Sequence, residues 1–405
     1  MPRTLRLMAL LLPALTVGAA AQQVNAFPER DDPLHVRVAM FTELMLGNHD
    51  NEGIIMPHVI FPPAGTERPL CGNQEDAADH TGMFLMAYSY KYAVTNDPAD
   101  RAMAGKFMDG VLKLEQVTGV PGWVARSFNR TEAPLWHEQV YFFPMEWHAS
   151  KSMPGYRWEG DLSSDKFVTL FCAMSVYHDL CADAERKRMA ADFLDRFVGR
   201  VVDHNFRLVD VDNKMTLWGN FCPDLPHEPL NSLEMLGGLR TAYQLTKDGR
   251  YIRAYHKLIR DHHYDDDAIM AKILWPERWK TSWDDHLAAK SLYPLMRYEN
   301  ERDLLQKYRM SLNRHWFDWR QRSCAHPGNA FLVMLYAVLT GKDVVTPERV
   351  AQMKQMWGFD RGKRVFSIPT DEGVKRVEAE YEGNATALIH AYWFGRYHGF
   401  IDAAW

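Results

Sequence analysis

The chain has 405 residues, of which 47 % are hydrophobic and 24 % are charged, as is usual for a globular protein. This composition excludes a disordered or fibrous chain. The net charge of −5 provides no basic excess for wrapping DNA or RNA, so we expect no nucleic-acid partner.

The first residues have the pattern of an export signal. Arg3 and Arg6 precede an apolar run that extends from Leu7 to Ala21 and ends in three alanines. This order is typical of a cleavable signal peptide, and the run is too short to span a membrane. We therefore expect residues 1–21 to be removed and residues 22–405 to form one domain, without a membrane span, in the periplasm or outside the cell.

The remaining chain repeats a helical hairpin. Residues 82–94 are apolar almost all round, which is typical of a helix buried on every side. A polar turn at 95–98 follows, and then Met103, Phe107 and Val111 form a stripe along one face of an outer helix. The same order of buried helix, turn and striped helix recurs at the turns 181–183, 246–249, 298–300 and 340–343.

This alternation predicts an all-α fold, a closed (α/α)6 toroid in which outer helices surround an inner ring. We expect a helix near residues 33–46 to complete the outer ring. An open solenoid also stacks helical pairs, but its repeats are more uniform in length than these. The six inner helices are predicted to begin near residues 75, 164, 232, 284, 329 and 384.

The connections between helices are of two kinds. Turns from inner to outer helices contain only a few residues, whereas the connections back to the inner helices are long. Long ordered loops on one face of a rigid scaffold usually carry functional residues. Residues 207–219, within one of them, predict a small β-hairpin. The long connections are residues 118–163, 204–230, 263–283, 318–328 and 358–383.

These hairpins, with turns such as AYQLTKDGRY at residues 242–251, resemble those of the six-hairpin (α/α)-toroid glycosidases and related polysaccharide lyases. The segments 156–166, 282–288 and 391–401 are similar to those of secreted bacterial proteins of this kind. The resemblance covers nearly all of the chain after the signal and rests on architecture. It implies action on glycans, with the site at the N-terminal ends of the inner helices.

Polar side chains cluster where each inner helix is predicted to begin. We expect the serines and asparagines to cap the helices, because their side chains satisfy N–H groups of the first turn. The carboxylates outnumber the caps that six helices need, so we expect at least two to act on the substrate. The capping candidates are Asn73, Ser163, Ser164, Asn231, Ser232, Asn329 and Asn384. The carboxylates are Glu75, Asp76, Asp79, Asp161, Asp165, Asp284 and Asp285.

Hydrolysis of a glycosidic bond is the reaction that this excess of carboxylates favours. One carboxyl group must keep its proton for the leaving oxygen, while the other activates water or attacks, and inverting enzymes hold the two roughly 6.5–9.5 Å apart. We expect Asp165 and Asp285 to form this catalytic pair, with Asp161, Asp284 and Glu75 as the substitutes.

Several residues near these acids suit the binding of a sugar. Trp158 and Trp283 each lie shortly before an inner helix, and we expect them to form platforms for sugar rings. Trp123 and Trp218 are further candidates, although each tryptophan could equally pack beneath a loop. Arg126 is expected to orient an acidic or hydroxyl-rich substrate. The expected partner is thus an oligo- or polysaccharide.

Two alternatives stay open. A lyase that acts on a uronate requires a base, a proton donor and a group that neutralises the carboxylate, whereas a glycan-binding protein requires only the tryptophans. Single histidines are more often hydrogen-bonded structural residues. The candidates for lyase chemistry are His80, His137, His148, His286, His326, Tyr141, Tyr381, Asn329 and Arg126.

No cofactor or metal ion is expected. None of the five cysteines belongs to a C-x-x-C pair, and we expect most of them to be buried, inert thiols. The segment 261–267, with two histidines and four aspartates, is expected to be an exposed polar loop. The spacing of Asp210, Asp212 and Lys214 resembles the start of a calcium loop, but the other ligands are missing and a turn is expected.

Overall fold

The computed structural model describes residues 27–61, 70–71, 75–133, 146–272, 282–317, 329–358, 361–370 and 372–405. The expected signal peptide lies outside these ranges, and its removal stays a prediction. Among the described helices, none is both long enough and apolar enough to cross a membrane.

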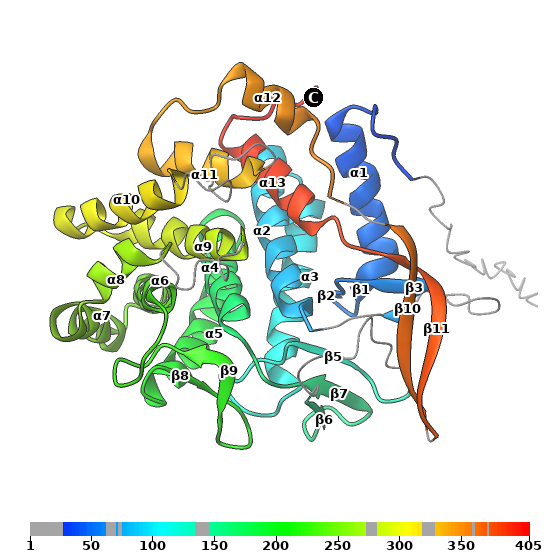
Figure 1. Ribbon diagram of the computed structural model, residues 1–405, viewed down its shortest axis with the longest axis horizontal. Helices are drawn as coiled ribbons and strands as arrows, with labels where there is room; N and C mark the ends of the chain where they lie inside the picture. The colour runs from blue at the N-terminus through cyan, green and yellow to red at the C-terminus, as the bar shows by residue number, and fades with distance from the viewer. Residues whose placement is uncertain are drawn as a thin grey trace, which may run out of the picture.

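An inner ring of six helices forms the centre of the described structure (Figure 1). Each inner helix contacts the next one along the chain, and the last contacts the first, so the ring closes. This closure confirms the predicted toroid, and every inner helix begins within three residues of its predicted start. The inner helices are α2 (Ala77–Thr95), α4 (Ser164–Leu180), α6 (Pro229–Thr246), α9 (Ser282–Tyr298), α11 (Ala330–Thr340) and α13 (Thr386–Tyr397).

The outer helices each pack against the inner helix of their own hairpin. In α5 the residues that are buried include Phe193, Phe197 and Val201, which form the apolar stripe read from the sequence. The predicted N-terminal helix is α1, and it closes the outer ring by packing on α13. The outer helices are α3 (Pro98–Gln116), α5 (Ala184–Asp203), α7 (Gly249–His262), α10 (Arg302–Trp316), α12 (Pro347–Lys354) and α1 (Leu34–Leu44).

The turns between inner and outer helices form as their residue types dictate. Asn96 ends α2 in the left-handed conformation, and the Asp97 side chain accepts the Ala99 N–H at 2.9 Å to cap α3. Thr346 caps α12 in the same way, with Pro347 at the first helical position, where its missing N–H is not needed. These tight turns fix the antiparallel hairpins and place all inner-helix N-termini on one face.

The strands lie in the connections that lead to the inner helices, in the lower and right-hand parts of Figure 1. The hairpin predicted at 207–219 is confirmed as β8 (Arg207–Val209) and β9 (Met215–Asn220). The long hairpin of β10 (Arg361–Thr370) and β11 (Gly373–Glu382) was not predicted. It pairs with β3 (Val59–Phe61) and through it with β4 (Leu70–Cys71). The remaining strands are β1 (Asp50–Asn51), β2 (Ile54–Ile55), β5 (Ser127–Arg130), β6 (Trp147–Ala149) and β7 (Tyr156–Glu159).

Two smaller predictions have different outcomes. The segment predicted as an exposed loop near residue 265 instead forms the short helix α8 (Tyr264–Met270), because its Asp265 and Asp266 pair with Lys307 of α10. The cysteines behave as expected where they are described, since Cys172, Cys181 and Cys222 are buried free thiols. Cys324 lies outside the described residues.

Candidate active site

The N-terminal ends of the inner helices meet on the face to which the long connections and their strands lead. We call this face the mouth of the ring. Contacts across it join helices that are far apart in the sequence, such as the 3.4 Å approach of His80 Nε2 on α2 to Asn384 Nδ2 beside α13. The mouth comprises residues 75–80, 163–166, 229–234, 283–290, 329–331 and 384–390.

Most inner helices are not capped in the predicted way. The N-cap residues of α2, α4, α6, α11 and α13 make no side-chain capping bond, whereas aspartate or threonine caps α3, α5, α7 and α12. The predicted cap Asn384 nevertheless accepts the Thr386 N–H of the first turn of α13 at 3.2 Å. The capping prediction was therefore wrong for Ser163, whose hydroxyl donates to Asp165, and for Ser232, whose hydroxyl donates to Asp267 at 2.8 Å. Uncapped first turns suit negative charge, including charge that develops on a substrate.

Asp165 lies in the first turn of α4 and is held by several donors. The Ser163 hydroxyl binds its Oδ1, and the Lys166 ammonium lies 2.9 Å from its Oδ2. Lys166 is buried and also pairs with Asp76 at the start of α2. Burial acts to raise the pKa of Asp165, but the Lys166 charge and the Ser163 bond lower it well below its usual range. Asp165 is therefore ionised, with 36 % of its side chain exposed.

Glu234 lies in the second turn of α6 and is fully buried. Among the described residues, neither of its carboxyl oxygens has a partner with hydrogen-bond geometry, although the Ser164 hydroxyl lies near. Burial raises the pKa of Glu234 far above its usual value, and the charges of Asp165 and Asp284 raise it further. Glu234 therefore keeps its proton at neutral pH, next to an ionised Asp165.

A buried ion pair lies at the centre of the ring. Lys290 of α9 donates to Asp79 of α2 at 2.9 Å and to the Thr169 hydroxyl of α4 at 2.6 Å. Burial acts to raise the pKa of Asp79, but the Lys290 charge outweighs it and the pKa is lowered. All three side chains are buried, so they tie three inner helices together.

Two neutral histidines face the same region. Burial, with a smaller contribution from the Lys290 charge, lowers the pKa of His286 to about 4 and that of His390 to about 3. The His286 ring stacks on Phe331 at 6.1 Å, and His286 hydrogen-bonds Asn329, the residue before α11. An uncharged imidazole of this kind can accept a proton from a substrate.

The predicted acids on α9 are separated by the structure. Asp285 is fully enclosed and binds His315 Nδ1 of α10 at 2.7 Å and Lys272, which follows α8. It therefore holds the inner ring to the outer layer and has no exposed atom at the mouth. Asp284 is partly exposed and lies near Glu234. Glu75, at the start of α2, is also partly exposed and lies close to Glu159.

Asp161 and Arg126 are bound to each other beside the mouth. The Arg126 Nε donates to the Asp161 carbonyl at 2.5 Å, and its terminal nitrogen lies 3.6 Å from the Asp161 carboxylate. Asp161 adopts a left-handed conformation (φ 51°), and its Oδ1 accepts the Leu217 N–H at 2.9 Å. Its carboxylate thus orders the β8–β9 hairpin, and one third of the side chain is exposed.

The aromatic candidates divide into exposed and buried groups. Trp283 is 69 % exposed and Trp218 is 57 % exposed, so each offers a ring face. Trp158 and Trp123 are buried, because β6 covers the former with His148 and the guanidinium of Arg200 covers the latter. These two tryptophans therefore pack beneath loops and offer no open platform.

The remaining lyase candidates have mixed positions. Tyr381 of β11 is buried between the Arg364 guanidinium, 4.0 Å from the centre of its ring, and His58. His148 lies in β6, outside the mouth. His137, Tyr141 and His326 lie outside the described residues.

Glu159, at the end of β7, was not singled out from the sequence. Its side chain is buried, and burial raises its pKa to about 8. Arg126 opposes this effect, whereas the charge of Glu75 adds to it. The Glu159 carboxyl group is therefore protonated in the folded protein at neutral pH.

A Glu159→Gln variant is expected to be more stable than the parent at neutral pH, by about 3 kcal/mol. The folded pKa is raised, so between pH 4.5 and about 8 the unfolded chain ionises while the folded one does not, and stability falls as pH rises. Glutamine removes that loss. Urea unfolding at several pH values measures the difference in unfolding free energy between the variant and the parent. A Glu132→Gln variant, at an exposed position, is the control. If this difference does not increase between pH 4.5 and about 8, the pKa of Glu159 is not raised as described.

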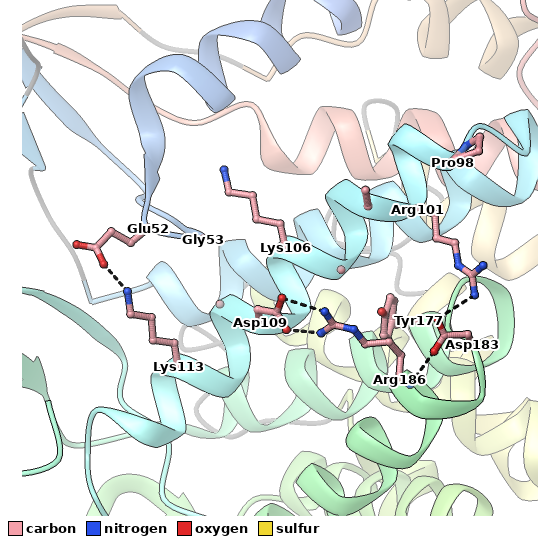
Figure 2. A pocket seen from close by; sticks show the side chains of 13 residues that line it. Glu52, Gly53, Pro98, Arg101, Lys106, Asp109, Lys113, Tyr177, Asp183 and Arg186 are labelled. Carbon is pink, nitrogen blue, oxygen red and sulfur yellow. Dashed lines mark hydrogen bonds and ion pairs between the residues drawn. The ribbon is translucent and has the colours of Figure 1, made fainter.

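A hollow of about 590 Å³ lies away from the mouth, along α3 and the start of α5 (Figure 2). Its charged groups are mostly engaged with each other, as in the pairs Arg186–Asp109 and Lys113–Glu52. Small residues of α3 form its floor. Burial raises the pKa of Tyr177, which also lines the hollow, to about 12, so this phenol stays protonated at neutral pH.

Comparison with protein-family models finds no match, and comparison with curated proteins finds none. Several solved structures follow a similar course. A sugar epimerase from a ruminal bacterium is 11 % identical, with a TM-score of 0.47, over 92 % of this chain and 97 % of its own. The closed ring of six inner helices gives the chain an (α/α)-toroid fold. The cellobiose 2-epimerase of Spirochaeta thermophila is 15 % identical over 91 % and 98 % of the chains (TM-score 0.44). An endoglucanase of Alicyclobacillus acidocaldarius is 13 % identical over 80 % and 65 % (TM-score 0.42).

At identities this low, no residue role transfers from these proteins to this chain. The neighbours include both epimerases and a glucanase, by their descriptions.

Three groups at the mouth were not predicted from the sequence. Glu234 follows Asn231 by three residues, a spacing typical of a capping box, and this hid its role. Lys290 is the only charged residue in the segment 287–296 of α9, and a charge within such an apolar segment is itself a signal of a buried partner. His390 lies in the last helix, whose aromatic residues suggested packing alone.

Proposed function

We propose that this protein is an exported enzyme that hydrolyses glycosidic bonds in an oligo- or polysaccharide. Asp165 acts as the ionised carboxylate and Glu234 as the carboxylic acid that donates a proton. The export part rests on the N-terminal pattern, and the glycan part on the toroid and on the exposed tryptophans near the mouth.

One observation carries the proposal. Two carboxyl groups on neighbouring inner helices have pKa values displaced in opposite directions, that of Asp165 downward and that of Glu234 upward. A glycosidase needs this division, because one group must protonate the leaving oxygen while the other activates water or attacks the sugar. Asp284 and Glu75 remain supporting carboxylates, whereas the enclosed Asp285 takes a structural role in this proposal.

Glu234 is enclosed, and this places a condition on the mechanism. Its proton reaches the leaving oxygen only if the bound glycan moves the side chains that cover it, and the Ser164 hydroxyl is one polar group that lies near it. Dry surroundings serve the chemistry, because they keep the acid protonated until the sugar arrives.

A Trp283→Ala variant is expected to raise KM for a long glycan roughly three- to tenfold, the equivalent of about 0.5–1.5 kcal/mol for one ring contact. Trp283 is exposed beside the start of α9, so it would bind ground state and transition state alike, and kcat should change little. Steady-state kinetics measure both constants. Tyr397→Ala, at the opposite end of inner helix α13, is the control, and an unchanged KM in Trp283→Ala would remove the platform.

A second function has one observation in its favour. The neutral, partly exposed His286 hydrogen-bonds Asn329, and such an imidazole suits removal of a proton from carbon, as a uronate lyase or a sugar epimerase requires. Arg126 could then face the acidic group of the substrate. In this alternative the histidines carry the reaction, and Glu234 and Asp165 have no catalytic role.

A screen of neutral and uronate-containing polysaccharides decides between these functions. New reducing ends without an ultraviolet-absorbing product support hydrolysis, and an unsaturated uronate that absorbs supports a lyase. Exchange of solvent deuterium into a sugar whose bonds stay intact supports an epimerase. If no polysaccharide or sugar changes while intrinsic tryptophan fluorescence reports binding, the protein is a glycan-binding protein and the proposal fails.

A further inference from the structure

Three side chains of different types meet between two loops beside the mouth. Glu146 and His148 flank Trp147 in β6, and Asp210 follows β8 directly. One ligand atom from each of the three lies within 4.8 Å of the other two. Asp210 is buried, whereas 36 % of the Glu146 side chain and 27 % of the His148 side chain are exposed, so one side of the group faces solvent.

The backbone fixes all three residues without help from a ligand. The Gly160 N–H donates to the Glu146 carbonyl at 2.7 Å, and β6 pairs with β7 so that the His148 ring stacks on Trp158 at 4.4 Å. Asp210 starts the β8–β9 turn, where its N–H donates to the Lys214 carbonyl at 2.9 Å. The turn predicted at this position is confirmed, but the Asp210 carboxylate faces Glu146 and His148.

Gly160 has no side chain, and this leaves a space beside Glu146, His148 and Asp210. A Cβ atom at this position would lie 2.9 Å from Asp210 Oδ2 and 3.1 Å from His148 Nε2, so a side chain here would collide with the group. His148 Nε2 is shielded from solvent and lies 2.8 Å from Glu146 Oε1, yet it lacks hydrogen-bond geometry to any described residue. The space that Gly160 leaves next to this shielded histidine nitrogen is an observation separate from the acidic charges.

We propose that Glu146, His148 and Asp210 bind one divalent transition-metal ion of the zinc class. Two carboxylates this close repel each other unless a cation lies between them. An imidazole with two carboxylates suits zinc, which takes three protein ligands and leaves a fourth position open, whereas calcium requires six to eight oxygens. The exposed side of the group supplies the open position.

The ion would join two loops at the edge of the mouth. Asp210 Oδ2 accepts the Asp161 N–H at 2.6 Å, and Asp161 in turn holds Leu217 of the β8–β9 hairpin. The metal would therefore fix the hairpin that carries Trp218 against the sheet of β5, β7 and β6. This inference stands independently of whether the protein is a hydrolase.

Metal binding to the full chain, freed of any histidine tag and stripped with chelator, tests the proposal. Titration with zinc chloride in a calorimeter should give one ion per chain, and cobalt(II) should give the visible absorption of a low-coordinate site. Zinc should also raise the melting temperature. His148→Ala and Glu146→Gln should each weaken zinc binding at least about 100-fold, the upper end of the loss that removing a mere supporting group causes.

The matched control is His256→Ala, which breaks an exposed histidine–glutamate pair on α7, 3.6 Å from Glu301, and should leave zinc binding unchanged. Circular dichroism shows whether each variant folds. Gly160→Ala provides a second route, because it fills the space while keeping all three ligands. The proposal is overturned if the stripped protein takes up no zinc, if His148→Ala binds as the parent does, or if calcium binds and zinc does not.

Discussion

Asp165→Asn and Glu234→Gln are each expected to lower kcat by roughly 10²–10⁴-fold on a glycan that the protein cleaves, the usual contribution of a general acid or base. Asparagine cannot carry the negative charge that Lys166 and Ser163 stabilise at Asp165. Glutamine has the shape of the protonated Glu234 but has no proton to donate to the leaving oxygen. Stopped assays of reducing ends measure the loss.

The pH profile should separate the two variants. Because the Asp165 pKa is lowered and that of Glu234 is raised, the parent should keep its activity across a broad range above acid pH and lose it as Glu234 ionises at high pH. Glu234→Gln should abolish that alkaline limb. Asp165→Asn should reduce the plateau and keep the limb.

The control for Asp165 is Asp179→Asn, near the other end of the same helix. Asp179 pairs with Arg297 at 2.7 Å, so its loss should lower stability without a large change in kcat. Asp285→Asn gives a second comparison, since this enclosed group binds His315 and Lys272. If Asp285→Asn folds normally and is inactive while Asp165→Asn is active, the proposed pair is wrong.

The fold was predictable from the sequence because its signals are local. A buried helix, a turn such as 95–98 and a one-sided stripe at Phe107 and Val111 each depend on neighbours within a few residues. The β10–β11 hairpin was missed because it interrupts a chain of helices, although Val377, Ala379 and Tyr381 of β11 carry a period of two.

The site was predictable only as a region. Adjacent residues on a helix point about 100° apart, so Asp284 and Asp285 cannot be told apart until the helix is placed against its neighbours. The structure turns Asp285 to the outer layer and leaves Asp284 near Glu234. Likewise, burial of Trp158 depends on β6, which pairs with it from a separate part of the long connection.

The mouth therefore combines two kinds of charge with different tasks. Asp165 is partly exposed and stabilised by Lys166, so its charge is available to a substrate. Asp79 is buried and matched by Lys290, so its charge serves the ring. Substitutions at the two should therefore have different effects. A change at Asp165 should affect turnover, whereas a change at Asp79 or Lys290 should affect folding and the nearby histidines.

A Lys290→Met variant is expected to lose about 3–5 kcal/mol of stability, because it leaves the Asp79 carboxylate buried without its cation. Lys290→Met combined with Asp79→Asn should recover much of that loss, since no charge then remains buried. Urea unfolding of the parent, both single variants and the double variant gives the coupling energy. Additive losses would show that the pair is not coupled.

The Asp79–Lys290 pair also makes the stability of the protein depend on pH at the acid end. Because the folded pKa of Asp79 is lowered, the stability it contributes is present above the unfolded value of 3.8 and disappears as pH falls through the lower folded value. The Lys290 charge also lowers the pKa of His286 and His390, so in Lys290→Met both should titrate at higher pH, which NMR of the imidazoles can follow. Unmoved histidine pKa values, with the stability lost, would mean that Lys290 ties the helices together without setting the charge state of the mouth.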